Sequence, residues 1–190
     1  MTAETDTTES GWGVLDGLPG HPMMWVLIVS ELAVFGILIT SVAVVRLVRP
    51  VEAAATQALL DPRLAFVNTL VLIVSGWLAA RAAVAARAGA RPATRRRLAG
   101  AMALGTAFIL IKLLEYAGEF GAGLDPEASG FSTLYVLITG FHLLHVGLGI
   151  VILAVVAPRA EADAVETGTA FWHMVDLVWL MIFPVLYLVR

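Results

Sequence analysis

Residues 131–156, FSTLYVLITGFHLLHVGLGIVILAVV, decide the fold class of this chain. The stretch contains no aspartate, glutamate, lysine or arginine, and its most polar side chains are His142 and His145. A membrane-spanning helix needs about 20 mostly apolar residues, so the stretch is long enough to cross a bilayer. Polar side chains inside such a span usually face a protein interior, because lipid cannot solvate them. We therefore predict a transmembrane helix with one polar face.

Four more stretches of this kind predict an all-α integral membrane protein with five transmembrane helices. The expected spans are residues 22–45, 64–86, 98–116, 131–156 and 169–189. Prolines mark most of their boundaries, since proline is tolerated at a helix start and disfavoured inside a helix. Pro184 falls inside the last span and predicts a kink there. Residues 22–190 would form one membrane domain, and residues 1–21 a flexible polar tail.

The composition agrees with a membrane protein. Hydrophobic residues make up 59% of the 190-residue chain, against about 45–50% in soluble domains, and the mean hydropathy is +0.89. The sequence has no cysteine, which excludes disulfides, iron–sulfur clusters and thiolate-bound haem or copper. We expect membrane lipids and membrane proteins as partners, and no nucleic acid.

The arginines predict the orientation in the membrane. If the N-terminus is cytoplasmic, the cytoplasmic loops carry six arginines: Arg87, Arg91, Arg95, Arg96, Arg97 and Arg159. The opposite side then carries four: Arg46, Arg49, Arg63 and Arg190. Cytoplasmic loops usually hold the excess of positive charge, so we expect the N-terminus inside and the C-terminus outside.

Glu31 is the only charged residue in the middle of the first span, where a short side chain cannot reach the membrane surface. It could be a buried carboxyl group kept protonated by desolvation. Alternatively, it is a protonated glutamate whose hydrogen bond to a neighbouring helix stabilises the packing of the two helices.

In the second span, Asn68 and Ser75 are seven residues apart and share a helix face. We expect these two, with Gly140 and Gly149 in the fourth span, to serve close helix packing.

The third span contains Lys112, the only lysine of the chain, with Glu115 three residues and Glu119 seven residues further on. This spacing places the three side chains on one helix face, so Lys112 and Glu115 can pair within the helix. The pair could belong to a proton relay. A structural pair near the outer membrane interface is the other reading, because pairing lowers the cost of burying both charges.

Histidines are the other unusual feature of the spans. His142 and His145 are three residues apart and, with His173 from the last span, could in principle form a three-histidine metal or haem site. Alternatively, the imidazoles hydrogen-bond across helices. His173 also precedes Asp176 by three residues, which suggests a fixed tautomer or a buried ion pair. Tyr187 and Arg190 are expected to anchor the last helix at the interface.

Taken together, five strings resemble subunit III of the haem–copper oxidase superfamily. They are Ser30-Glu31, VNTLVLIVSG at 67–76, Glu115-Tyr116, STLYVLITGFHLLHVGLGI at 132–150 and ETGTAFWHMVDLVWL at 166–180. The resemblance covers nearly everything from Pro22 onward. The chain looks like the short, five-helix form of that family. The sequences of its first and last spans are most similar to the nitric oxide reductase accessory protein NorE.

The resemblance implies an accessory role without redox chemistry in a bacterial cell membrane. Haem and copper would sit in the catalytic subunit I of an oxidase or nitric oxide reductase, and this chain would hold no metal or cofactor. It would pack on that subunit, bind phospholipid in a cleft, and support proton uptake and durability. Carried over from the family, Glu31 matches a buried, carbodiimide-reactive glutamate. A polar cluster around the lipid cleft would comprise His142, His145, Glu166, His173 and Asp176.

Two readings from other classes remain at this point. One is a stand-alone haem or metal protein that uses His142, His145 and His173. The other is a small transporter with Lys112 and Glu115 as its relay, although the sequence shows no paired broken helices or inverted repeats.

Overall fold

Long helices make up almost all of the computed structural model, which describes residues 22–189. The expectation of a flexible tail at 1–21 lies outside the described residues. The helices are α1 (Pro22–Val48), α2 (Pro50–Gln57), α3 (Pro62–Arg87), α4 (Arg91–Gly121), α5 (Gly130–Val156) and α6 (Ala162–Phe183). A π-helical turn, η2 (Pro184–Leu188), continues α6. Within residues 22–189, five helices are long and apolar enough to cross a membrane, so the predicted five-span membrane fold is confirmed.

Local signals in the sequence explain several helix starts. The carboxylate of Asp61 accepts hydrogen bonds from the backbone N–H groups of Arg63 and Leu64, and Pro62 occupies the first turn. Both features favour a helix start, because the first N–H groups of a helix have no partner inside it. Ser129 and Ser132 form a reciprocal cap at the start of α5 in the same way.

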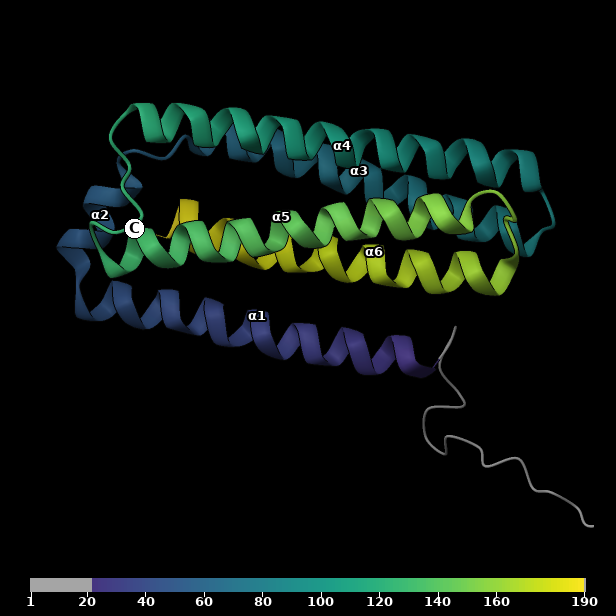
Figure 1. Cartoon of the computed structure of the whole chain (residues 1–190), viewed down its shortest axis with the longest axis horizontal. Helices are drawn as coiled ribbons and strands as arrows, with labels where there is room; N and C mark the ends of the chain where they lie inside the picture. The colour runs from purple at the N-terminus through teal and green to yellow at the C-terminus, as the bar shows by residue number, and fades with distance from the viewer. Residues whose placement is uncertain (1–21, 190) are drawn as a thin grey trace, which may run out of the picture.

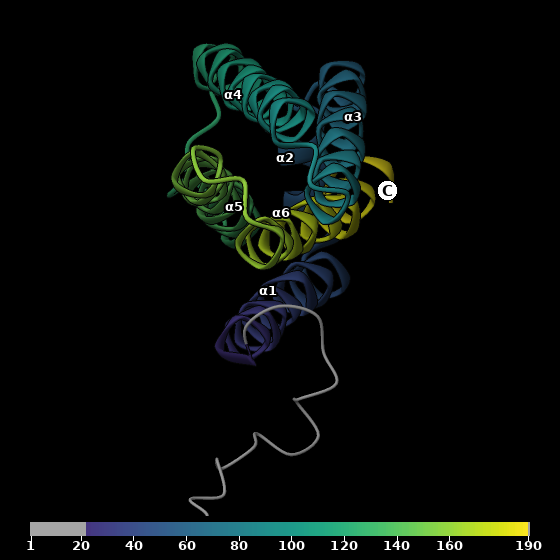
Figure 2. The same ribbon diagram turned by 90° about the vertical axis from the view of Figure 1, so that its right-hand side faces the viewer.

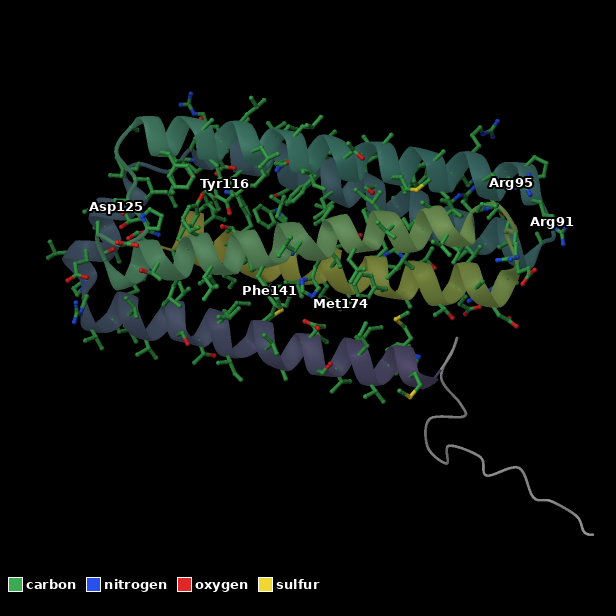
Figure 3. All side chains as sticks on the ribbon, in the orientation of Figure 1. Arg91, Arg95, Tyr116, Asp125, Phe141 and Met174 are labelled. Carbon is green, nitrogen blue, oxygen red and sulfur yellow. The ribbon has the colours of Figure 1, made fainter. Side chains whose placement is uncertain are left out.

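Two helices, α4 and α6, begin about two turns before their expected spans, and one short helix is additional. Helix α6 begins at Ala162, whereas its span was expected from residue 169. The third transmembrane helix was expected at 98–116, but α4 begins at Arg91 and ends at Gly121. Pro92 lies in its first turn, where proline does not interrupt a helix, and arginine and alanine are good helix formers. Arg91 and Arg95 therefore lie on the first turns of α4 rather than in a loop (Figure 3). The short helix α2 was not expected at all.

Pro184 ends the regular α-helix of α6, at the position where the sequence predicted a kink. Proline lacks an N–H group, and the chain continues as the π-helical turn η2, which changes the backbone hydrogen-bond pattern. Side chains from elsewhere bind its carbonyl groups. The Arg46 guanidinium donates to the Val185 carbonyl at 2.6 Å, and the Gln57 amide donates to the Leu186 carbonyl at 2.7 Å. The ends of α1 and α2 are thereby joined to the end of the chain.

The helices α3, α4, α5 and α6 form a ring around a shared core, seen end-on in Figure 2. Helix α1 packs outside this ring against α5 and α6. The largest buried side chains of the core include Trp172, Trp179, Phe108 and Tyr135. The outer faces carry exposed leucine, valine and isoleucine side chains, as expected where lipid rather than water is the solvent.

Candidate functional site

The main polar feature of the bundle interior is a cluster built around Lys112. We call it the lysine cluster; it consists of Lys112, Glu115, Glu119, Tyr135 and Tyr187. The three charged side chains come from one face of α4, as the spacing predicted, and all are buried, with Lys112 at 0% exposure. Tyr135 lies near the start of α5 and Tyr187 in η2, so the cluster joins three elements at one end of the bundle.

The ammonium group of Lys112 has three polar partners. Its Nζ atom donates to the hydroxyl of Tyr135 at 2.8 Å and to that of Tyr187 at 2.7 Å, and it lies 3.2 Å from Glu115 Oε1. The rings of Tyr116, Tyr135 and Tyr187 also surround the cation at 4.7–5.5 Å, a distance at which an aromatic face attracts a positive charge. An ammonium group has three N–H bonds, so these contacts satisfy it completely.

Tyr135 and Tyr187 connect Lys112 to the two carboxyl groups by hydrogen bonds. The Tyr187 hydroxyl donates to Glu115 Oε1 at 2.6 Å, and the Tyr135 hydroxyl donates to Glu119, whose two oxygens are both 2.7 Å away. Each tyrosine thus accepts from the lysine and donates to a different glutamate. Tyr116 extends the network toward α5, because its hydroxyl lies 2.5 Å from Thr139 Oγ1.

The charges of the lysine cluster do not balance when every group is ionised. One ammonium faces two carboxylates, and a net charge buried in a membrane bundle is costly. The cluster becomes neutral when one of the two glutamates carries a proton. Glu115 Oε2 is buried and has no hydrogen-bond partner among residues 22–189, so the cluster leaves one carboxyl oxygen unsatisfied.

A second polar contact joins α1 to α5. The carboxyl of Glu31 lies 3.1 Å from His145 Nε2, and the side chains are 22% and 10% exposed. His145 Nδ1 lies 2.8 Å from the Phe141 carbonyl one turn earlier, which favours a proton on Nδ1. In that tautomer Nε2 can only accept, and Glu31 Oε2 makes no hydrogen bond within residues 22–189, so the two side chains form a close polar contact between α1 and α5.

His142 lies inside an aromatic box. Its ring stacks on Trp179 at 5.1 Å and meets Phe108 and Phe35 edge-on at 5.7 and 6.2 Å. Both ring nitrogens are buried and have no hydrogen-bond partner among residues 22–189. His142 therefore contributes to packing between α1, α4, α5 and α6.

His173 and Asp176 lie on another face, between α6 and α3. Their closest nitrogen and oxygen atoms are 3.7 Å apart, and the side chains are 43% and 12% exposed. The carboxylate of Asp176 lies directly against Gly76 of α3, where any side-chain Cβ would collide with it. Glu166 lies elsewhere again, paired with Arg87 at the end of α3.

A comparison with protein families identifies the architecture. The model of the cytochrome c oxidase subunit III family matches residues 14–189 of the chain. The chain belongs to this family. Among relatives, cytochrome c oxidase subunit 3 of Synechocystis is 28% identical over 190 residues, covering 93% of this chain and 80% of the relative. The probable cytochrome c oxidase subunit 3 of Mycobacterium tuberculosis is 32% identical over 130 residues, covering 64% of each protein.

A third relative is much longer than this subunit III family member. The heme-copper oxidase subunit I+III of Aeropyrum pernix is 28% identical over 182 residues, which cover 87% of this chain and 22% of that protein. The chain thus spans about a fifth of the Aeropyrum protein and just under two thirds of the mycobacterial one. The predicted family is confirmed, and the closer likeness to NorE stays a prediction.

The structure distributes the five residues of the expected polar cluster over three places. His142 and His145 lie near α1, His173 and Asp176 face α3, and Glu166 pairs with Arg87. The physical reason is that His142 and His145 belong to α5 and the other three to α6, where Glu166 lies about two turns before His173 along the same helix. The alternative three-histidine site is not formed either, because no three metal-ligating side chains gather within residues 22–189.

The lysine cluster was predicted in part. The sequence placed Lys112, Glu115 and Glu119 on one face, but it assigned Tyr187 to an interfacial anchor, and the structure buries Tyr187 against Lys112 and Glu115. The Lys112–Glu115 pair is fully enclosed at the end of the bundle that carries η2, and the reading as a structural pair near the outer interface stays a prediction. Its expected partner in the anchor, Arg190, lies outside the described residues. A buried lysine with three N–H bonds and one glutamate in reach was the signal that further hydroxyl partners were needed.

The residues expected to serve helix packing make the following contacts. The Asn68 amide donates to the Phe108 carbonyl at 3.2 Å, and the Ser75 hydroxyl donates to the Ala101 carbonyl at 2.8 Å, both between α3 and α4. A Cβ at Gly149 would lie 2.7 Å from the Trp172 ring, so only glycine fits there. A Cβ at Gly140 would find its nearest neighbour at 3.9 Å, which is an ordinary distance.

Proposed function

We propose that this chain is an accessory, non-redox subunit of a haem–copper complex that packs on the catalytic subunit I. One observation carries the proposal: the Aeropyrum relative is named as subunits I and III in one protein, and its similar part covers 87% of this chain. A segment that is covalently joined to subunit I in one protein is expected to associate with subunit I as a separate chain in another. The family match over residues 14–189 supports the same role.

The complex is either an aerobic terminal oxidase or a nitric oxide reductase of a bacterial inner membrane. The amino-acid sequence of the spans resembles NorE, whereas the relatives reported above are named as cytochrome c oxidase subunits. We propose that the chain supports the stability and proton uptake of the complex, with all haem and copper held by the partner. The lysine cluster fits such a supporting role, since it ties α4, α5 and η2 together without exposing a reactive group.

Phospholipid binding is part of the same proposal. A pocket of about 240 Å³ lies where α1 meets α2 and is lined by Arg46, Pro50, Ala53, Ala54 and Gln57. It lies at the end of a membrane span, where lipid headgroups are found, and its arginine suits a phosphate. Ala54→Trp would fill this pocket, and the variant should retain less phospholipid than the wild-type chain after washing in detergent, measured by mass spectrometry.

The test of the main proposal is a purification of the tagged chain from its native membrane in mild detergent. We expect a haem–copper subunit I to co-purify, identified by mass spectrometry, and every haem band of the optical spectrum to belong to it. The identity of that partner distinguishes oxidase from nitric oxide reductase. A chain that arrives coloured and alone would contradict the proposal, as would a chain without such a partner.

A further inference from the structure

The face between α3 and α6 carries an open groove of about 320 Å³, which we call the α3–α6 groove. Its lining includes Ile73, Gly76, Trp77, His173, Asp176 and Leu180. Most of this lining is apolar, as on any membrane-facing surface. The groove differs from the other outer faces because an imidazole and a carboxylate lie beside an exposed tryptophan.

The groove lies close to the middle of the membrane. Trp77 is ten residues from Arg87 at the nearer end of α3, which is about 15 Å at the rise of an α-helix. Asp176 lies similarly far from both ends of the stretch formed by α6 and η2. The hydrocarbon core is about 30 Å thick, so lipid headgroups do not reach this depth and only acyl chains could contact the groove.

Acyl chains are a poor environment for this lining. The His173 side chain is 43% exposed and cannot find a hydrogen-bond partner in hydrocarbon. Trp77 is 60% exposed at mid-depth, whereas membrane tryptophans that face lipid are enriched at the interfaces. Arg81, one turn further along α3, lies 6.0 Å from the Trp77 ring and is also exposed. Tryptophan with polar neighbours is typical of the centre of a protein–protein interface.

We infer that the α3–α6 groove is the surface on which a transmembrane helix of the catalytic subunit docks, a step that rests on the proposed function. That helix presents a hydroxyl or amide side chain at mid-membrane depth to His173 and Asp176. The absence of a Cβ at Gly76 keeps α3 against the Asp176 carboxylate and holds the polar pair in place. Polar contacts of this kind are a normal way for membrane helices to associate.

Photo-cross-linking in the full complex tests the groove directly. Benzoylphenylalanine replaces Trp77 in one variant and Leu144 in the control; Leu144 is 72% exposed near the middle of α5, outside the groove. We expect at least tenfold more adduct with the catalytic subunit from position 77 than from position 144. Adducts from position 77 with lipid only, or with a second copy of this chain, would overturn the inference.

Substitutions give a second readout that does not depend on the probe. His173→Leu replaces an exposed polar side chain by an apolar one, so on a lipid-facing surface it would leave assembly unchanged or improve it. On a docking surface, His173→Leu and Trp77→Ala should each lower the amount of co-purified catalytic subunit about tenfold, while Leu144→Ala leaves it unchanged. If the wild-type chain co-purifies with the catalytic subunit and these variants do too, only the docking surface is wrong. If the wild-type chain brings no such subunit, the proposed function itself fails.

Discussion

At the scale of single residues, Lys112 shows how a charge can be kept inside a membrane bundle. The lysine is fully buried, yet two tyrosine hydroxyls and a glutamate satisfy its three N–H bonds. The hydroxyls of Tyr187 and Tyr135 donate in turn to Glu115 and Glu119. Each member of the cluster therefore has a hydrogen-bond partner within the protein. Such a network fixes the relative positions of the helices that supply it.

Lys112→Met should lower the free energy of unfolding by about 3–5 kcal/mol, because removal of one partner leaves buried carboxyl groups without their cation. The measurement is unfolding of the detergent-solubilised chain followed by circular dichroism. The double variant Lys112→Met, Glu115→Gln should recover part of the loss. A single variant as stable as the wild type would show that the cluster contributes nothing to the fold.

Glu31 should react with a hydrophobic carbodiimide in the membrane, because such a reagent modifies protonated carboxyl groups and this side chain is partly exposed on α1. Glu115 should stay unmodified, since its side chain is only 1% exposed. Peptide mass spectrometry locates the adduct, and Glu31→Gln is the control. An unmodified Glu31 would contradict the prediction of a protonated carboxyl group at this position.

At the scale of the elements, close contact between α5 and α6 depends on Gly149, which lies under the ring of Trp172. Gly149→Ala should lower the free energy of unfolding by about 1–3 kcal/mol, because the new Cβ would lie 2.7 Å from the ring and force the helices apart. Gly147, two residues earlier, has nothing within 4 Å of a built Cβ. Gly147→Ala should therefore be neutral or stabilise the helix by up to about 1 kcal/mol. Equal effects at the two positions would contradict this account of the α5–α6 contact.

At the scale of the whole molecule, the two ends of the bundle differ in charge. Arg91 and Arg95 lie at one end and Asp125 at the other (Figure 3). Five of the eleven arginines lie at the end of α3 or in the first turns of α4, and the connection from α4 to α5 has none. They are Arg87, Arg91, Arg95, Arg96 and Arg97. This asymmetry is the physical basis for expecting the arginine-rich end in the cytoplasm.

The absence of cysteine makes the orientation easy to test. Single cysteines can replace two exposed residues at opposite ends, Arg96 and Glu127. A membrane-impermeant maleimide should label Glu127→Cys in intact cells and Arg96→Cys only after the membrane is opened. The reverse pattern would show that the N-terminus faces outward.

Much of the fold could be read along the chain. Length and hydropathy determine the five spans, since each must cover the membrane thickness with its own backbone hydrogen bonds. The i, i+3, i+7 spacing placed Lys112, Glu115 and Glu119 on one face of α4. The short helix α2 was not predicted because it contains no apolar stretch of membrane length. The early start of α4 was not predicted because its arginines lower the local hydropathy, although arginine is a good helix former.

The sequence by itself determined the membrane fold, the family and the charged face of α4, because these depend on residues close together along the chain. Only the tertiary structure decided which side chains meet across helices. Tyr135 and Tyr187 are 52 residues apart, and their common contact with Lys112 depends on how α4, α5 and η2 pack. Helix packing also keeps His173 apart from His142 and His145, since helical spacing fixes the face of each residue but not the neighbour that this face meets.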